Sequence, residues 1–102
     1  MNEAEMRYYL VIDAEYHGTG IRDYYNGGYL DPNDLHLSAA TIEWLNKWQA
    51  RYENEHYSGY GNDKVIDELD REGKEIALTI KKELQDSKIQ YYSDARMTKE
   101  II

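Results

Sequence analysis

Apolar and polar residues alternate near the start of the chain. From Arg7 to Tyr16 every second residue falls on the same side, and one side carries Tyr8, Leu10, Ile12 and Ala14. A period of two is typical of a β-strand. The segment Lys88–Ser93 alternates in the same way, whereas we expect the residues after Asp94 to fray. The pattern therefore predicts one strand at each end of the chain.

Between these strands the apolar residues recur at the three- and four-residue spacings of two helices. The first helix is predicted to begin after Ser38, a good N-cap, and to run to about Asn54. The second is predicted to begin at a cap on Asn62 or Asp63 and to reach about Gln85. Gly73 interrupts the apolar stripe of this second helix, which predicts a close approach to a neighbouring element.

A long connection containing glycine, His17–Leu37, joins the first strand to the first helix. Its Asn26-Gly27-Gly28 predicts a turn, with a short hairpin between Tyr24-Tyr25 and Tyr29-Leu30. The element order is strand, hairpin, helix, helix, strand. This order favours a single small α+β domain over residues 1–102, with an ordered core at about 7–93 and two helices packed on one face of a small antiparallel or mixed sheet.

The composition excludes several classes of protein. The chain has no cysteine, which excludes a disulfide scaffold and thiolate-bound metals. Its longest apolar run, Tyr8–Ile12, is far shorter than a membrane helix requires. Glu3 and Glu5 lie where a secretion signal would be positively charged. We therefore expect a cytoplasmic protein that makes no contact with membranes.

Patterns that carry catalysis or bind metals are weak. His17, His36 and His56 lie far apart in sequence, and no nucleophile motif is present. Asp13 and Glu15 beside His17 would form a cation site only if they converged, and alternation along the strand directs both carboxylates to solvent. We predict no catalytic residue, no metal and no cofactor.

The charge favours a basic partner. The chain has 20 acidic residues against 12 Lys and Arg, a net charge of -8, which disfavours direct binding of nucleic-acid phosphates. Residues 1–34 hold much of this excess. Charges on the second helix are nearly balanced, and Asp67–Arg71 and Asp70–Lys74 are predicted as ion pairs on a solvated helix face.

Carboxylates and tyrosines interleave at the end of the first strand and along the connection. The predicted partner-binding residues are Asp13, Glu15, Tyr16, Asp23, Tyr24, Tyr25, Tyr29 and Asp31. Tyrosine offers a large contact area at low entropic cost, and carboxylates steer a basic partner. A core position is the alternative for each tyrosine. We favour the core for Tyr8, Tyr52 and Tyr91, whereas Tyr24, Tyr25 and Tyr29 stay open between recognition and core.

The chain resembles the small acidic immunity proteins of bacterial contact-dependent growth inhibition and polymorphic toxin systems. The resemblance runs from about Tyr8 to Tyr92. Its residues are Leu30-Asp31-Pro32, Leu35-His36-Leu37-Ser38, Leu45, Trp48, Tyr52, Ser58-Gly59-Tyr60, Glu72-Gly73, Ile76-Ala77, Glu83-Leu84 and Ile89-Gln90-Tyr91. It implies that the partner is a toxin domain which binding neutralises. Ala14 to Asp23 lacks the pattern of the relatives, so the identity of the toxin does not carry over.

Three functions follow as hypotheses. The main one is an immunity protein that occludes the active site or substrate surface of a cognate, basic nuclease toxin. The alternative is an acidic mimic of nucleic acid, or an antitoxin-like inhibitor of a DNA-binding protein, which requires one continuous acidic stripe. A small enzyme would need a pocket that gathers at least two ionisable groups with shifted pKa values, and we expect none.

Overall fold

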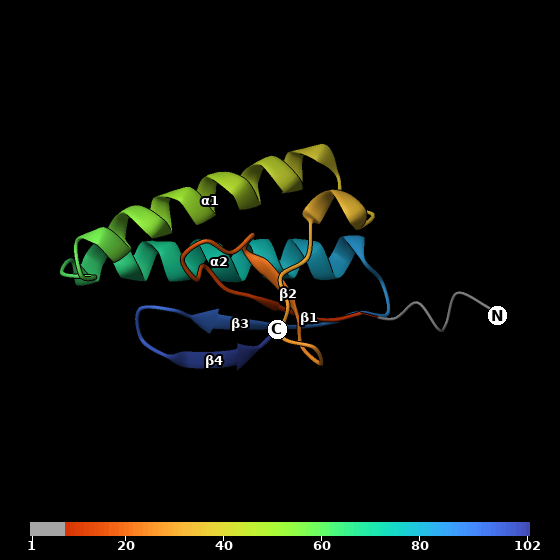
Figure 1. Ribbon diagram of the computed structural model, residues 1–102. Helices are drawn as coiled ribbons and strands as arrows, with labels where there is room; N and C mark the ends of the chain where they lie inside the picture. Colours follow the sequence, from red (N-terminus) through yellow and green to blue (C-terminus); the bar gives the residue numbers. More distant parts are fainter. Residues whose placement is uncertain (1–7) are drawn as a thin grey trace.

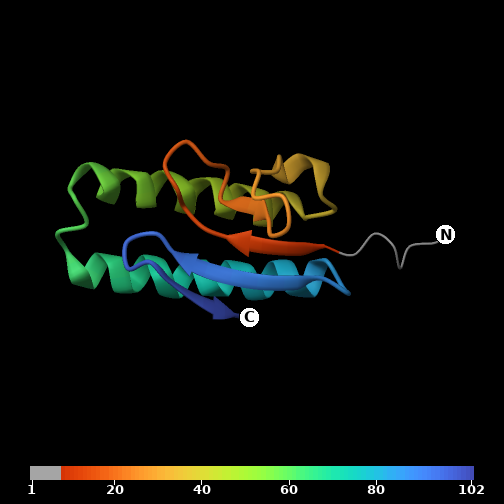
Figure 2. The same ribbon diagram turned by 60° about the horizontal axis from the view of Figure 1, so that its bottom comes forward.

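Two helices lie across one face of a four-stranded sheet in the computed structural model, which describes residues 8–102 (Figure 1). The strands are β1 (Tyr9–Ile12), β2 (Ile21–Asp23), β3 (Lys88–Ser93) and β4 (Thr98–Ile101), and the helices are α1 (Ala39–Tyr57), α2 (Asp63–Glu83) and the short 3-10 helix η2 (Pro32–Asp34). The α+β class and the two helices on one sheet face are confirmed. The other face is uncovered by helices (Figure 2).

The sheet is mixed and has the order β2-β1-β3-β4. The central strands β1 and β3 are parallel, with Leu10 opposite Ile89 and Ile12 opposite Tyr91. β2 pairs with β1 and β4 pairs with β3, both antiparallel. Because β1 and β3 run in the same direction, their carboxyl ends meet at one edge of the molecule.

The first strand is shorter than predicted, and Arg7, its predicted start, lies outside the described residues. β1 ends at Ile12 because the next residue joins a loop, where the Asp13 N–H donates to the Gly20 carbonyl at 3.1 Å. The predicted hairpin forms, but its first arm is β2 (Ile21–Asp23) and not Tyr24-Tyr25. Arg22 bridges Tyr29 across it, so Tyr24 and Tyr25 lie in the turn.

The helix caps match the prediction. The Ser38 hydroxyl accepts from the Thr41 N–H at 3.1 Å, and the Asn62 side chain accepts from the first N–H groups of α2. Helix α1 continues three residues beyond the expected Asn54, and α2 ends at Glu83. The Glu83 carboxylate accepts hydrogen bonds from Ser38 and Thr41, which joins the end of α2 to the start of α1.

Gly73 marks the closest approach of α2 to its neighbours. A Cβ atom at this position would come within 2.3 Å of the Tyr91 ring and 2.7 Å of the Trp48 ring. The packing explanation for this glycine is therefore confirmed. Tyr52 and Tyr91 are buried in the core as predicted, and Tyr8 packs partly buried against it.

Two expectations about the C-terminal part are wrong. The chain after Asp94 forms β4, which pairs with β3. The ion pairs predicted within α2 do not form in the described residues, because the β3–β4 turn brings Arg96 to Asp67 and to the buried Asp70, while Lys74 pairs with Glu100. These cross-element partners could not be recognised without the fourth strand.

Candidate functional site

The turn of the β2 hairpin gathers three of the predicted residues, of which Tyr24 and Tyr25 are exposed and Asp23 is half-buried. Tyr24 and Tyr25 are 42% and 76% exposed. The Tyr24 ring stacks on Tyr9 with a centroid separation of 3.9 Å, and Tyr25 contacts both rings edge-on. Asp23 accepts from the N–H groups of Tyr25 and Asn26, so its carboxylate also shapes the turn. We call Asp23, Tyr24 and Tyr25 the hairpin tip.

Two predicted residues, Asp13 and Tyr29, lie behind this tip and hold it in place. The expectation that alternation along the strand exposes Asp13 is wrong, because Asp13 is only 1% exposed. The hairpin folds over it, so that its carboxylate pairs with Arg22 and accepts from the Tyr29 hydroxyl at 2.6 Å. Burial lowers the pKa of Arg22, but the hydrogen bond and charge of Asp13 outweigh it and raise that pKa overall.

Tyr29 bridges both carboxylates of the loop after β1. Its hydroxyl also lies 3.1 Å from Glu15 Oε1, and burial followed by the bond to Asp13 raises the pKa of Tyr29 strongly. The phenol therefore stays a neutral donor. Its ring packs on Gly18, where an added Cβ would come within 2.7 Å. The Glu15 carboxylate itself is exposed.

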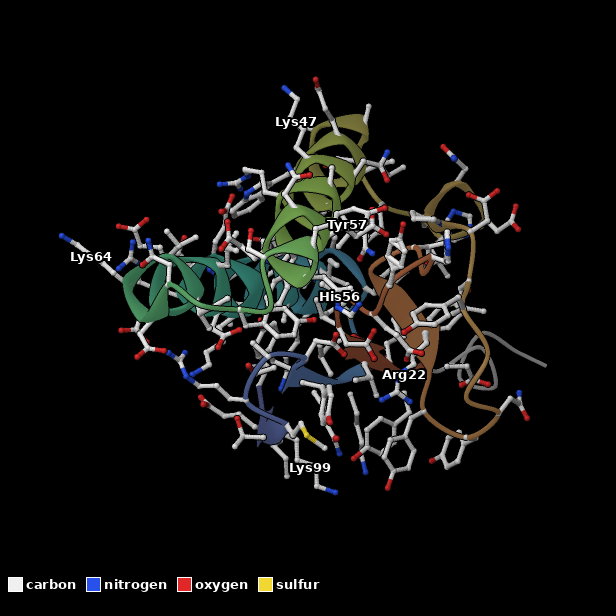
Figure 3. All side chains as sticks on the ribbon, turned by 60° about the vertical axis from the view of Figure 1, so that its left-hand side comes forward. Arg22, Lys47, His56, Tyr57, Lys64 and Lys99 are labelled. Carbon is white, nitrogen blue, oxygen red and sulfur yellow. The ribbon has the colours of Figure 1, made fainter. Side chains whose placement is uncertain are left out.

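Tyr16 joins a cluster of aromatic residues at the end of α1. Its ring stacks on His56 with a centroid separation of 5.2 Å, and its hydroxyl is hydrogen-bonded to Tyr57. That bond is the first cause of the raised pKa of Tyr16. Tyr57 is 73% exposed. Figure 3 shows His56 and Tyr57 together at the end of α1.

Five residues of this end were missed as site residues by the sequence analysis: Glu53, His56, Tyr57, Tyr60 and Asp94. Tyr60 donates to Asp94 at 2.9 Å, and its hydroxyl lies 2.7 Å from His56 Nδ1. Burial raises the pKa of Asp94, the bond from Tyr60 partly offsets this, and the charges of Asp13 and Glu15 raise it further. Asp13 and Asp94 directly follow β1 and β3, so the parallel pairing of these strands places both at the same edge of the sheet, and that pairing could not be predicted from the sequence.

Asp31 differs from the other predicted residues in its surroundings. Its side chain caps η2 by accepting from the Asn33 N–H at 2.9 Å, and the residue is exposed. The structure thus sorts the other predicted residues into three groups. Asp13, Glu15 and Tyr29 are in contact, Asp23, Tyr24 and Tyr25 form the hairpin tip, and Tyr16 lies against the end of α1. Asp31 bonds within its own turn.

A cavity of about 340 Å³ lies between α2 and β4, lined in part by Asp70, Tyr91 and Arg96. The expectation that no pocket gathers two groups with shifted pKa values is wrong. Burial raises the pKa of Tyr91, whereas burial lowers that of Arg96 but is outweighed by the charges of Asp67 and Asp70, which raise it overall. Both shifts move proton loss further from neutral pH, so neither group is suited to proton transfer there. Across residues 8–102, no group of three or more His, Asp and Glu side chains is arranged to hold a metal ion.

The exposed tyrosines and carboxylates offer groups that can contact another protein. The hydroxyls of Tyr16 and Tyr29 are committed to internal hydrogen bonds, whereas the rings of Tyr24, Tyr25 and Tyr57 offer broad apolar surface to solvent. Such amphipathic rings beside charged groups are typical of protein interfaces.

Comparisons with known proteins agree with this picture. No curated protein matches the chain. Within residues 8–102 the structure contains no helix with the length and apolar character needed to cross a bilayer. A family described as "Serratia CdiI immunity protein-like" matches residues 9–94, which is most of the chain. The chain therefore belongs to this family of immunity proteins of contact-dependent growth inhibition.

Proposed function

We propose that this chain protects its cell by binding a cognate toxin domain, that this toxin is a basic nuclease, and that the bound chain occludes its active site or substrate surface. No catalysis and no cofactor are required, because occupancy alone excludes the substrate. The proposal includes a cytoplasmic location, where a nuclease toxin would meet nucleic acid.

The observation that carries the proposal is the exposure of large aromatic rings beside carboxylates in an acidic chain. Tyr25 and Tyr57 are 76% and 73% exposed, although burying such rings is favourable. The net charge of -8 attracts a positively charged partner over long range and raises its association rate. A stable complex would cover roughly 800 Å² on each partner.

The eight predicted residues take different parts in this proposal. The hairpin tip, Glu15 and Tyr16 contact the toxin. Asp13 and Tyr29 act as positioning residues, because their side chains bind each other and hold the loop from which Glu15 extends. Asp31 contributes charge at the margin of the surface while it caps η2.

The test is the affinity for the cognate toxin domain, measured by titration calorimetry. Tyr25→Ala, with Tyr24→Ala as a second variant, should weaken binding by well over tenfold, because each substitution removes an exposed ring. Asp23→Asn removes the charge but keeps an oxygen that can cap the turn. It should therefore weaken binding without loss of the fold.

Matched controls lie on α2. Leu78→Ala removes an exposed apolar side chain away from the proposed surface, and Glu75→Lys reverses an exposed charge there. Glu75→Lys is matched to a further variant of the proposed surface, Glu15→Lys, which reverses an exposed charge and should weaken binding at least tenfold. Both controls should bind within about twofold of the parent. Absence of binding by the parent chain would refute the proposal, and full affinity in Tyr25→Ala and Glu15→Lys would refute the proposed surface. Nuclease activity of the toxin, with and without the chain, tests the class of toxin.

A further inference from the structure

The uncovered face of the sheet contains a hollow of about 210 Å³. All four strands or their ends contribute to its lining, which consists of Val11, Arg22, Tyr24, Gln90, Tyr92 and Lys99. The register accounts for this grouping, since Val11 lies opposite both Arg22 and Gln90, and Tyr92 lies opposite Lys99. The hollow is thus built on paired strands rather than on loops.

The charge around the hollow is opposite to that of the chain as a whole. Arg22 is paired with Asp13, but Lys99 forms no ion pair with any of residues 8–102. The same is true of Lys88, whose Nζ lies 5.9 Å from the centre of the Tyr9 ring on this face. In a chain of net charge -8, two lysines on one sheet face that form no ion pair within residues 8–102 favour an anionic group.

The hollow continues directly from the hairpin tip. Tyr24 belongs to both, because its ring stacks on Tyr9 and also lines the hollow. Figure 3 shows Arg22 and Lys99 on the side of the sheet away from the helices. A protein that covers the hairpin tip therefore reaches the hollow without a second docking event.

We infer that this hollow receives an aspartate or glutamate side chain of the toxin, bound by Lys99 and by the hydroxyls of Tyr24 and Tyr92. The inference rests on the proposed function. Lysine donates up to three hydrogen bonds and a phenol donates one, a set that matches a carboxylate. The volume equals that of about seven water molecules, enough for such a side chain with some of its waters.

A second copy of this chain fits the hollow poorly. A two-fold dimer through this face would place the patch that carries Lys88 and Lys99 against its own copy, and both chains are strongly acidic. A toxin with a carboxylate beside a basic surface complements both parts of the face. Contacts of both signs would also discriminate against toxins that are merely basic.

The experiment compares charge reversals in the complex of the full chain with its cognate toxin domain. Lys99→Glu should weaken binding at least tenfold, and Lys99→Gln by less, because it removes the charge without adding repulsion. The matched control is Lys64→Glu, which changes the net charge equally at an exposed site distant from Arg22 and Lys99 (Figure 3). This control should stay within about twofold. Circular dichroism and a thermal melt establish that each variant folds.

The outcomes separate the inference from the proposed function. If the parent chain binds the toxin and Lys99→Glu binds as tightly as Lys64→Glu, the inference is wrong while the proposed function stands. If the parent chain is a dimer that Lys99→Glu dissociates, a second copy covers this face and the inference is also wrong. A rescue experiment would support the inference. A toxin in which one Asp or Glu is replaced by Lys should regain affinity for the Lys99→Glu variant of this chain but not for the Tyr25→Ala variant.

Discussion

Asp70 is the residue on which the polar core depends. Asp70 is only 7% exposed, and its buried carboxylate accepts hydrogen bonds from four side chains. It accepts from Tyr52 at 2.9 Å, Tyr91 at 2.6 Å, Ser93 at 2.8 Å and Arg96 at 3.1 Å. These partners come from α1, β3 and the turn after β3. A single carboxylate on α2 thus connects both layers of the fold.

Asp70→Asn should destabilise the protein by about 3 kcal/mol, because the amide offers one acceptor oxygen to four donors and leaves Arg96 without its buried counter-charge. Urea denaturation measures the loss. Asp67→Asn is the matched control, since Asp67 pairs with the same arginine through a side chain that is 70% exposed. Its cost should be below about 1 kcal/mol. Equal costs in the two variants would contradict the assigned role of Asp70.

At the scale of elements, the sequence predicts what is encoded locally. The caps at Ser38 and Asn62 and the alternation of Lys88–Ser93 each depend on neighbouring residues, and each reappears in the structure. β4 escaped prediction because all four of its residues are exposed and no apolar alternation marks them. The same division applies to the candidate site. The turn signal indicates where Tyr24 and Tyr25 become exposed, whereas the position of Asp94 near the end of β1 depends on the strand order.

The fourth strand makes a testable contribution to stability. A chain that ends at Asp94 loses the β3–β4 ladder, the pairing of Arg96 with Asp70, and Ile102, which packs against the core. We expect a loss of at least 3 kcal/mol, much of it from the unpaired buried carboxylate. A chain that ends at Ile101 keeps the ladder and Arg96, and should lose about 1 kcal/mol. Comparable stability of the shorter chain and the parent in urea would show that β4 is dispensable.

For the whole molecule, tyrosine in place of phenylalanine couples stability to alkaline pH. Burial is the first cause of the raised pKa of Tyr29, Tyr52, Tyr60 and Tyr91, and it raises the pKa of Tyr52 to about 12 from 10.0. In the unfolded chain these phenols ionise near their ordinary pKa, about 10. Their contribution to stability is therefore complete below pH 10 and is lost as the pH rises through the folded values.

The free energy of unfolding should thus stay level between about pH 8 and 9 and fall steeply from pH 10 to 12, with roughly 2–3 kcal/mol of the fall due to Tyr52. Denaturant titrations at each pH measure it. Tyr52→Phe should lower stability at pH 8, since it breaks the bond to Asp70, yet should show a shallower decline above pH 10. Tyr25→Phe, at an exposed position, should follow the slope of the parent. Tyrosinate absorbance that rises completely before the protein unfolds would contradict this account, because buried phenols can ionise only when the core opens.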